Sequence, residues 1–183
     1  MRSLLLLPAL FTLGAVADLL LVDFPHLIIP LNYSAPDTAY GTQKSGEVSN
    51  RVYTEVSFDV RADIPAKICR LNFHINTNPT KNAPWTLDGA GPYTFLIGRQ
   101  RPWIDTDKDT WNTYPDVQNY AATVEVSKDG SVNIEDGWFQ CGKGEVAQFL
   151  LYSMSPDMRL TWYELDYPQE LGGPHGIVLE MHS

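Results

Sequence analysis

Apolar and polar residues alternate with a period of two along much of this chain. At positions 56–60, 69–75 and 122–126, every second residue is apolar and the residues between them are mostly polar. Successive side chains of a β-strand point to opposite faces of a sheet, so each run predicts a strand with one buried and one solvated face. Runs with the helical period are nearly absent. The pattern therefore predicts an all-β chain.

Further strand candidates extend this prediction along the sequence. They lie at positions 26–31, 93–97, 132–134, 147–154, 160–165 and 177–181. Clusters rich in Gly and Pro separate them, and Lys128-Asp129-Gly130 predicts a hairpin turn between two alternating runs. About nine short strands joined by such turns predict an antiparallel β-sandwich of the jelly-roll or Greek-key type. No repeat, linker or low-complexity tract divides residues 18–183, which we interpret as a single domain.

The first 17 residues have the pattern of a secretory signal peptide. Arg2 supplies a positive start, positions 4–13 are mostly apolar, and Ala15-Val16-Ala17 forms an A-x-A cleavage site. A buried N-terminal helix is the alternative, and Pro8 counts against it. The C-terminus carries no long hydrophobic tail that would signal a lipid anchor. We therefore expect a secreted protein, extracellular or in a cell wall, without a membrane anchor.

Acidic residues outnumber basic ones, and the full chain has a net charge of −9 at pH 7. Removal of the leader would make the protein more acidic by one charge, because Arg2 is lost with it. This balance disfavours nucleic acid and anionic membranes as partners. It would suit a cationic partner or a divalent metal ion.

Two features follow from the expected export. Cys69 and Cys141 form an even pair, which predicts one disulfide, with two free buried thiols as the alternative. Because Cys69 has the register of an inward-facing strand residue, we expect the bridge to join the two sheets across the core. Asn32-Tyr33-Ser34 is a sequon for N-linked glycosylation of Asn32.

The stretch WIDTDKDTW places aspartates at alternate positions between two tryptophans. Asp105, Asp107 and Asp109 have the spacing that opens an EF-hand loop. Thr110 stands where that loop needs glycine and Asp116 where it needs glutamate, so an EF-hand is excluded. A calcium loop of another kind remains one interpretation, and a solvated acidic loop is the other. No other cofactor is expected.

The aromatic residues of this region form the candidate ligand-binding set, which consists of Trp85, Trp103, Trp111 and Tyr114. They lie in sequence typical of loops, where exposed rings stack on sugar rings or anchor a protein partner. The alternative is that they fold back as a lid on the edge of the sandwich. Trp138 and Trp162 lie in strand-like sequence and are expected in the core.

Patterns for catalysis are absent from the sequence. It contains no G-x-S-x-G, no H-E-x-x-H and no Gly-rich phosphate loop, and its four histidines are dispersed. The 22 acidic residues leave a carboxylate pair for glycoside hydrolysis open, but no pattern selects two of them. No catalytic residue is assigned, and whether the protein is an enzyme stays uncertain, with a non-catalytic role favoured.

Several segments together resemble a known fungal family. They are HLIIPL (26–31), PDTAYGT (36–42), VYTEVSFDV (52–60), ICRLNF (68–73), FQCGKGEVAQFLLY (139–152) and GIVLEM (176–181). In strand spacing and cysteine placement they resemble the ubiquitin 3 binding protein But2 C-terminal domain family. The resemblance implies a β-rich, secreted or cell-surface protein of filamentous fungi with no established reaction.

The family name also implies contact with an activating enzyme of the ubiquitin-like pathway. That enzyme is intracellular, and a secretory leader is hard to reconcile with it, so we do not carry this partner over. The sequence favours a secreted, non-catalytic protein that binds a protein or a cell-wall glycan. A carbohydrate-active enzyme or its accessory module, and a structural wall protein, are the alternatives.

Overall fold

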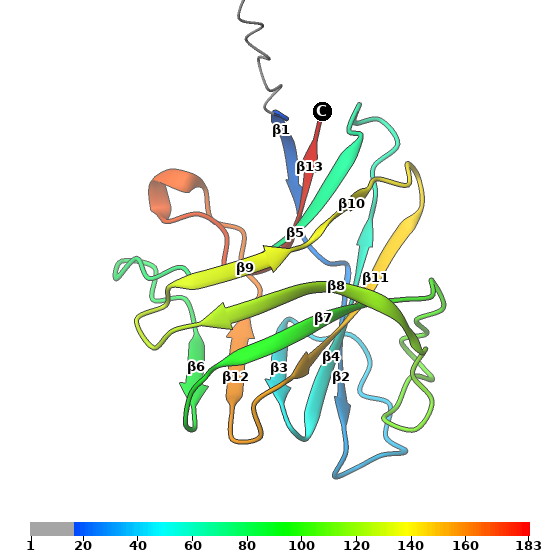
Figure 1. Ribbon diagram of the computed structural model, residues 1–183, viewed down its shortest axis with the longest axis vertical. Coiled ribbons are helices and arrows are strands. Elements are labelled where there is room, and N and C mark those ends of the chain that lie inside the picture. The colour runs from blue at the N-terminus through cyan, green and yellow to red at the C-terminus, as the bar shows by residue number, and fades with distance from the viewer. Residues whose placement is uncertain (1–16) are drawn as a thin grey trace, which may run out of the picture.

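A computed structural model describes residues 17–183 (Figure 1). The predicted signal peptide lies outside these described residues except for Ala17. Within them, almost all regular structure is strand, and each ladder is antiparallel. No helix in this range is long and apolar enough to cross a membrane.

The strands form three sheets. Sheet A has the order β1 (Leu19–Asp23), β13 (Gly176–His182), β5 (Ile68–His74), β10 (Trp138–Gln140). Sheet B has the order β2 (Leu27–Asn32), β4 (Val52–Asp59), β11 (Val146–Ser153), β7 (Thr94–Gln100), β8 (Val117–Val126), β9 (Val132–Asp136). Sheet C has the order β3 (Ser45–Ser49), β12 (Arg159–Tyr163), β6 (Trp85–Asp88). A short 3₁₀-helix, η1 (Gln169–Leu171), precedes β13.

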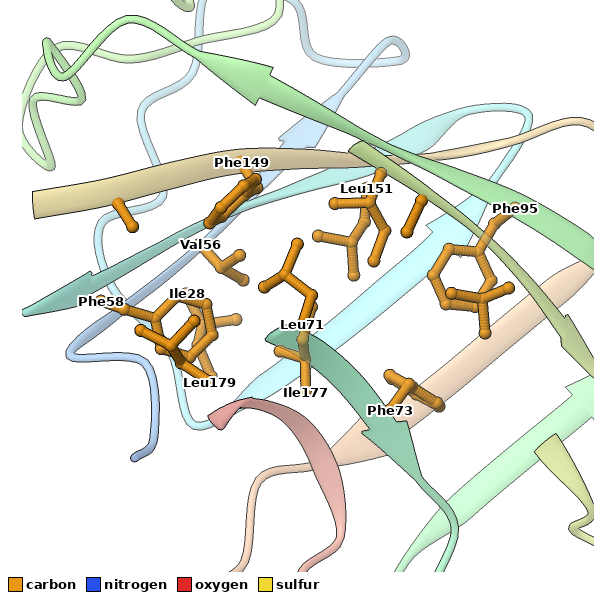
Figure 2. Packing of buried hydrophobic residues seen from close by; sticks show 14 of the residues in the cluster. Ile28, Val56, Phe58, Leu71, Phe73, Phe95, Phe149, Leu151, Ile177 and Leu179 are labelled. Carbon is orange, nitrogen blue, oxygen red and sulfur yellow. The ribbon is translucent and has the colours of Figure 1, made fainter. Parts of the chain in front are cut away.

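One apolar core lies between the sheets, as the period-two pattern predicts. Figure 2 shows Val56, Phe149 and Leu151 of sheet B facing Leu71 and Ile177 of sheet A. All five are buried, and at about 25 cal/mol per Å² of apolar surface such burial is the main force that holds the sheets together. The predicted antiparallel β-sandwich is confirmed.

Every strand that the alternation predicts is present, and so is the hairpin at Lys128–Gly130. Ser127 N–H bonds the carbonyl of Ser131, and Gly130 adopts a left-handed φ of 86° that favours glycine. The prediction missed β1, β3, β6 and β10. These strands are short, and segments such as SGEVS in β3 carry no alternating apolar pattern, so only pairing with a neighbour defines them.

The disulfide is confirmed, but the predicted placement across the core is wrong. Cys69 and Cys141 are bonded with their Cα atoms 5.1 Å apart. Strand β10 lies directly beside β5, with Phe139 opposite Cys69, and Cys141 follows that strand. The bridge therefore joins two neighbouring strands of sheet A. The sequence showed which way Cys69 faces, but it did not show that β10 would be the neighbour of β5.

Trp138 and Trp162, both expected in the core, differ in their burial. Trp162 on β12 is buried and packs edge-on against Phe73, as predicted. Trp138 is 50% exposed, and that prediction is wrong. In β10 it is Phe139 that packs against the core, which turns Trp138 and Gln140 to the outer face of sheet A.

A second apolar cluster lies on the opposite, outer face of sheet B. Its buried members are Ile29 and Leu31 of β2 and Leu150 of β11. Residues of the segment 101–116, which joins β7 to β8, pack over them. We call this segment the β7–β8 loop. It holds the WIDTDKDTW stretch, so the sheet face beneath it determines where that stretch lies.

Candidate functional site

The β7–β8 loop divides the predicted aromatic set. The ring of Trp111 lies 4.6 Å from Tyr53 of β4 and 5.4 Å from Tyr33, centroid to centroid, and 6.4 Å from Tyr114. Trp111 and Tyr114 thus pack onto sheet B as part of the second cluster. Trp103 is 64% exposed, with the guanidinium of Arg101 4.8 Å above its ring. The loop therefore acts mainly as a lid on sheet B, which was the alternative interpretation of these aromatic residues.

The three aspartates of the loop face different partners. The carboxylate of Asp105 accepts a 2.6 Å bond from Lys108 Nζ, which lowers the pKa of Asp105. Asp109 turns inward and accepts a 2.7 Å bond from the backbone N–H of Asp105. In residues 17–183 no three His, Cys, Asp or Glu side chains are grouped to hold a metal ion. The calcium site stays a prediction, without support from this arrangement.

Asp109 instead meets a buried acid of sheet B. Glu55 on β4 is fully buried, and Gln100 Nε2 donates to its Oε1 at 2.7 Å. Burial raises the pKa of Glu55 to about 8, a hydrogen bond from Gln100 lowers it, and the neighbouring charge of Asp109 raises it. Oε2 of Glu55 is buried without a hydrogen-bond partner. Because its pKa is about 8, Glu55 is mostly protonated at neutral pH, near Asp109 of the loop.

A groove of about 670 Å³ lies along the polar face of sheet C. Thr86, Thr161 and Glu47 share one row of that sheet and line the groove. The hydroxyls of Thr86 and Thr161 are 2.8 Å apart. Leu87, Leu160 and Val48, one residue further along each strand, point into the core. The alternation of strands thus gives the groove a polar floor.

An ion pair at the floor supplies charge. Arg159 Nε and Nη2 bond the two carboxylate oxygens of Glu47 at 2.9 and 2.8 Å. This fork geometry holds both side chains flat against the sheet. Thr54 Oγ1 donates to the carbonyl of Glu47 at 2.6 Å and accepts its N–H, which fixes β3 against β4. Hydrogen bonds therefore hold the floor to β4, and its outward-facing groups are polar.

The wall of the groove is the segment 40–43, in which Tyr40 of the PDTAYGT stretch and Gln43, the residue that follows that stretch, line the groove. Gln43 N–H bonds the carbonyl of Ile28 at 2.7 Å, and Thr42 Oγ1 accepts from Ile28 N–H at 3.1 Å, so this segment follows β2. Gly41 has φ of 66°, a left-handed turn that lets Tyr40 reach the groove rim. Tyr40 is 38% exposed, and Tyr163 lines the floor.

Of the four predicted aromatic residues, Trp85 alone lines this groove. It belongs to β6 and is paired with Trp162, whose ring is in the core, so the ring of Trp85 also turns to the inner face. The groove-forming polar residues were missed because β3 and β6 were not predicted. The PDTAYGT stretch was noticed, but its role as a wall is set by contacts with β2.

Buried ionisable groups behind sheet C have structural partners. His175 Nδ1 accepts from Asn76 N–H at 2.9 Å, and its Nε2 lies 3.2 Å from the carbonyl of Pro84 at the groove edge. Burial lowers the pKa of His175, so the ring is neutral. Burial raises the pKa of Glu164 to about 8, and its carboxyl accepts from Trp162 Nε1 at 3.0 Å. These groups do not line the groove.

The comparisons agree with the resemblance seen in the sequence. The family model described as ubiquitin 3 binding protein But2 C-terminal domain matches residues 23–168, which include both sides of the groove and the β7–β8 loop. The chain belongs to this family. No curated protein matches it. Membership is compatible with a non-catalytic binding role.

Proposed function

We propose that this protein is a secreted, non-catalytic fungal β-sandwich protein that binds a cell-wall glycan in the groove of sheet C. The observation that carries the proposal is the composition of the groove. Hydroxyl, amide and paired charged groups line its floor, and tyrosines stand at its rim and floor. Sites of this size, with a few fixed polar groups that orient the ligand, are typical of small-ligand binding.

The groups of the groove suit a neutral polyhydroxyl chain better than an ion. Glu47 and Arg159 neutralise each other, so the floor offers donors and acceptors without a net charge. Thr86 and Thr161 each donate and accept, as sugar hydroxyls do. Tyr40 presents an exposed ring at the rim, which can pack on the C–H face of a pyranose.

The same lining favours binding over hydrolysis. Glycoside hydrolysis uses two carboxyl groups on opposite sides of the scissile bond. Glu47 is the one carboxylate among the described residues that line the groove, and Arg159 engages both of its oxygens. The close pair Glu55 and Asp109 is sealed beneath the β7–β8 loop. Neither place offers the arrangement that an enzyme would need.

A glycan array probed with protein produced without N-glycosylation tests the proposal. We expect binding to a polysaccharide fragment that weakens about tenfold in Tyr40→Ala, as for loss of one stacked ring. Tyr120→Ala is the matched control, since Tyr120 is also an exposed ring but lies on β8 outside the groove. Equal weakening in both variants, or no binding by the parent protein, would contradict the proposal. Release of reducing sugar that Glu47→Gln abolishes would replace it with an enzymatic function.

One other surface favours a protein partner as the second candidate function. Leu19, Ile68 and Trp138 are each at least 40% exposed on the outer face of sheet A. Trp138 lies 5.0 Å from the ring of His182 and 5.1 Å from the guanidinium of Arg70, centroid to centroid and to Cζ. Exposed aromatic and arginine side chains together are typical of protein-binding hot spots. If the protein is found attached to the cell wall but binds neither glycans nor other proteins, a structural role would be indicated.

A further inference from the structure

Asn32, the sequon asparagine, lies at the groove itself. It is the last residue of β2, and it has the register of Ile28 and Pro30, which point to the inner side of sheet B. Where β2 leaves the core, this face becomes one side of the groove, and Pro30 and Asn32 line it. A glycan attached to Asn32 would therefore begin inside the proposed binding site.

The amide of Asn32 is oriented toward the groove. Its Oδ1 accepts a 2.8 Å bond from the N–H of Ser34, which fixes the direction of the side chain. Its Nδ2, the atom that a glycan would be joined to, lies 3.4 Å from the hydroxyl of Tyr40. This contact is exposed, so the attachment atom is accessible. The first sugar would lie beside the ring of Tyr40.

The groove continues from that point along sheet C. Beyond Tyr40 it offers Gln43, the Thr86–Thr161 pair and the Glu47–Arg159 pair. A glycan tethered at the rim is present at these groups at an effective concentration of about millimolar. Its binding does not cost the translational entropy that a free glycan loses. A tethered chain therefore competes strongly with a free glycan that binds weakly.

We propose that N-glycosylation of Asn32 closes the groove, because the core sugars of the attached glycan occupy it and exclude free glycan. This inference rests on the proposed function, since it assigns a regulator to the same site. Glycosylated protein would then be the form that does not bind, and unmodified protein the form that does. The ligand class for both occupants is the same, a neutral chain of pyranose rings.

The experiment compares secreted wild-type protein with Ser34→Ala from the same eukaryotic host. Ser34→Ala removes the sequon but keeps Asn32 and Tyr40 in place, and mass spectrometry reports the glycan. The probe is N,N′-diacetylchitobiose, the disaccharide that begins N-linked glycans. We expect its affinity for glycosylated protein to be at least about tenfold lower than for Ser34→Ala. Hydrogen exchange at 84–88 and 159–163 should be slower in the glycosylated form.

Each result separates the inference from the proposed function. Unmodified Asn32 in secreted wild-type protein, or equal probe affinity and equal exchange in both forms, would overturn the inference alone. If Ser34→Ala bound neither the probe nor any glycan on an array, the proposed function would fall instead. Should Ser34→Ala not be secreted, a peptide N-glycosidase that removes the whole glycan from folded wild-type protein, converting Asn32 to aspartate, gives the open form, and unchanged affinity after this treatment overturns the inference.

Discussion

The β7–β8 loop and the groove of sheet C differ in what their conspicuous side chains contact. In the loop, Trp111 packs on Tyr53 and Asp109 meets Glu55, so the groups that looked available to a ligand are bound within the protein. In the groove, Thr86 and Tyr40 are exposed at the surface, and Thr161 beside Thr86 is half-buried. Tryptophans and acids in a loop are therefore a weak sign of a binding site when the sheet face beneath that loop is apolar.

The largest expected effect tests whether the two regions share one scaffold. Cys69→Ala with Cys141→Ala removes the disulfide of sheet A, which should cost about 4 kcal/mol of the free energy of unfolding. Because one core connects the three sheets, exchange protection of the loop and of the groove should be lost at the same denaturant midpoint. Separate midpoints would show that the loop and the groove unfold independently and do not share one scaffold.

The next effect distinguishes the two tryptophans of the loop. Trp111→Ala removes a half-buried ring from the second cluster and should lower the free energy of unfolding by about 2–4 kcal/mol. Trp103→Ala, the matched control at an exposed ring, should change it by less than about 0.5 kcal/mol. Chemical denaturation measures both. Similar losses in the two variants would mean that the loop is not held in the way described here.

The buried acid pair makes the loop sensitive to pH. Glu55 has an ordinary pKa of 4.5 when exposed and about 8 when buried, so the folded protein holds its proton more tightly than the unfolded chain does. The stability that the protonated group supplies is complete below about pH 4.5 and is lost as the pH rises through 8. Between pH 5 and 9 we expect Glu55 to account for a loss of about 4 kcal/mol of the free energy of unfolding.

Glu55→Gln keeps the shape of the protonated acid and removes its titration. The groups that face position 55 are Gln100 from β7 and Asp109 from the loop, and Glu164 behind sheet C titrates in the same direction. The variant should therefore lose less stability than wild type between pH 5 and 9, with the remaining loss due to groups such as Glu164. Thermal melting across this range measures the difference. Parallel pH profiles would show that Glu55 does not cause the loss of stability.

The smallest effect on stability should come from the groove. Arg159→Ala breaks an exposed ion pair with Glu47, and such pairs contribute about 0.2–1 kcal/mol. The same change should weaken glycan binding about tenfold, since two floor groups lose their fixed geometry. Isothermal titration beside chemical denaturation gives both numbers. A large loss of stability with unchanged affinity would reverse the contrast between the groove and the loop.

The sequence predicted much of the fold and little of the candidate site. Alternation at 56–60, 69–75 and 122–126 determines which side chains of those strands are buried, because the pleat permits no other arrangement. It could not reveal β3 or β6, since SGEVS and WTLD become strands only through pairing with β12. Glu47 on β3 and Thr86 on β6, two polar residues of the groove, were therefore missed as well.

The amino-acid sequence contains local properties of the chain: strand periodicity, turn chemistry, an even cysteine pair and a sequon. The fold sets which segments become neighbours. It placed β10 beside β5, so that the disulfide lies within sheet A, and it laid residues 40–43 along β2, so that Asn32 faces a groove. The physical reason is that strand pairing and face-to-face packing join residues far apart in the chain, and no local pattern records the partner.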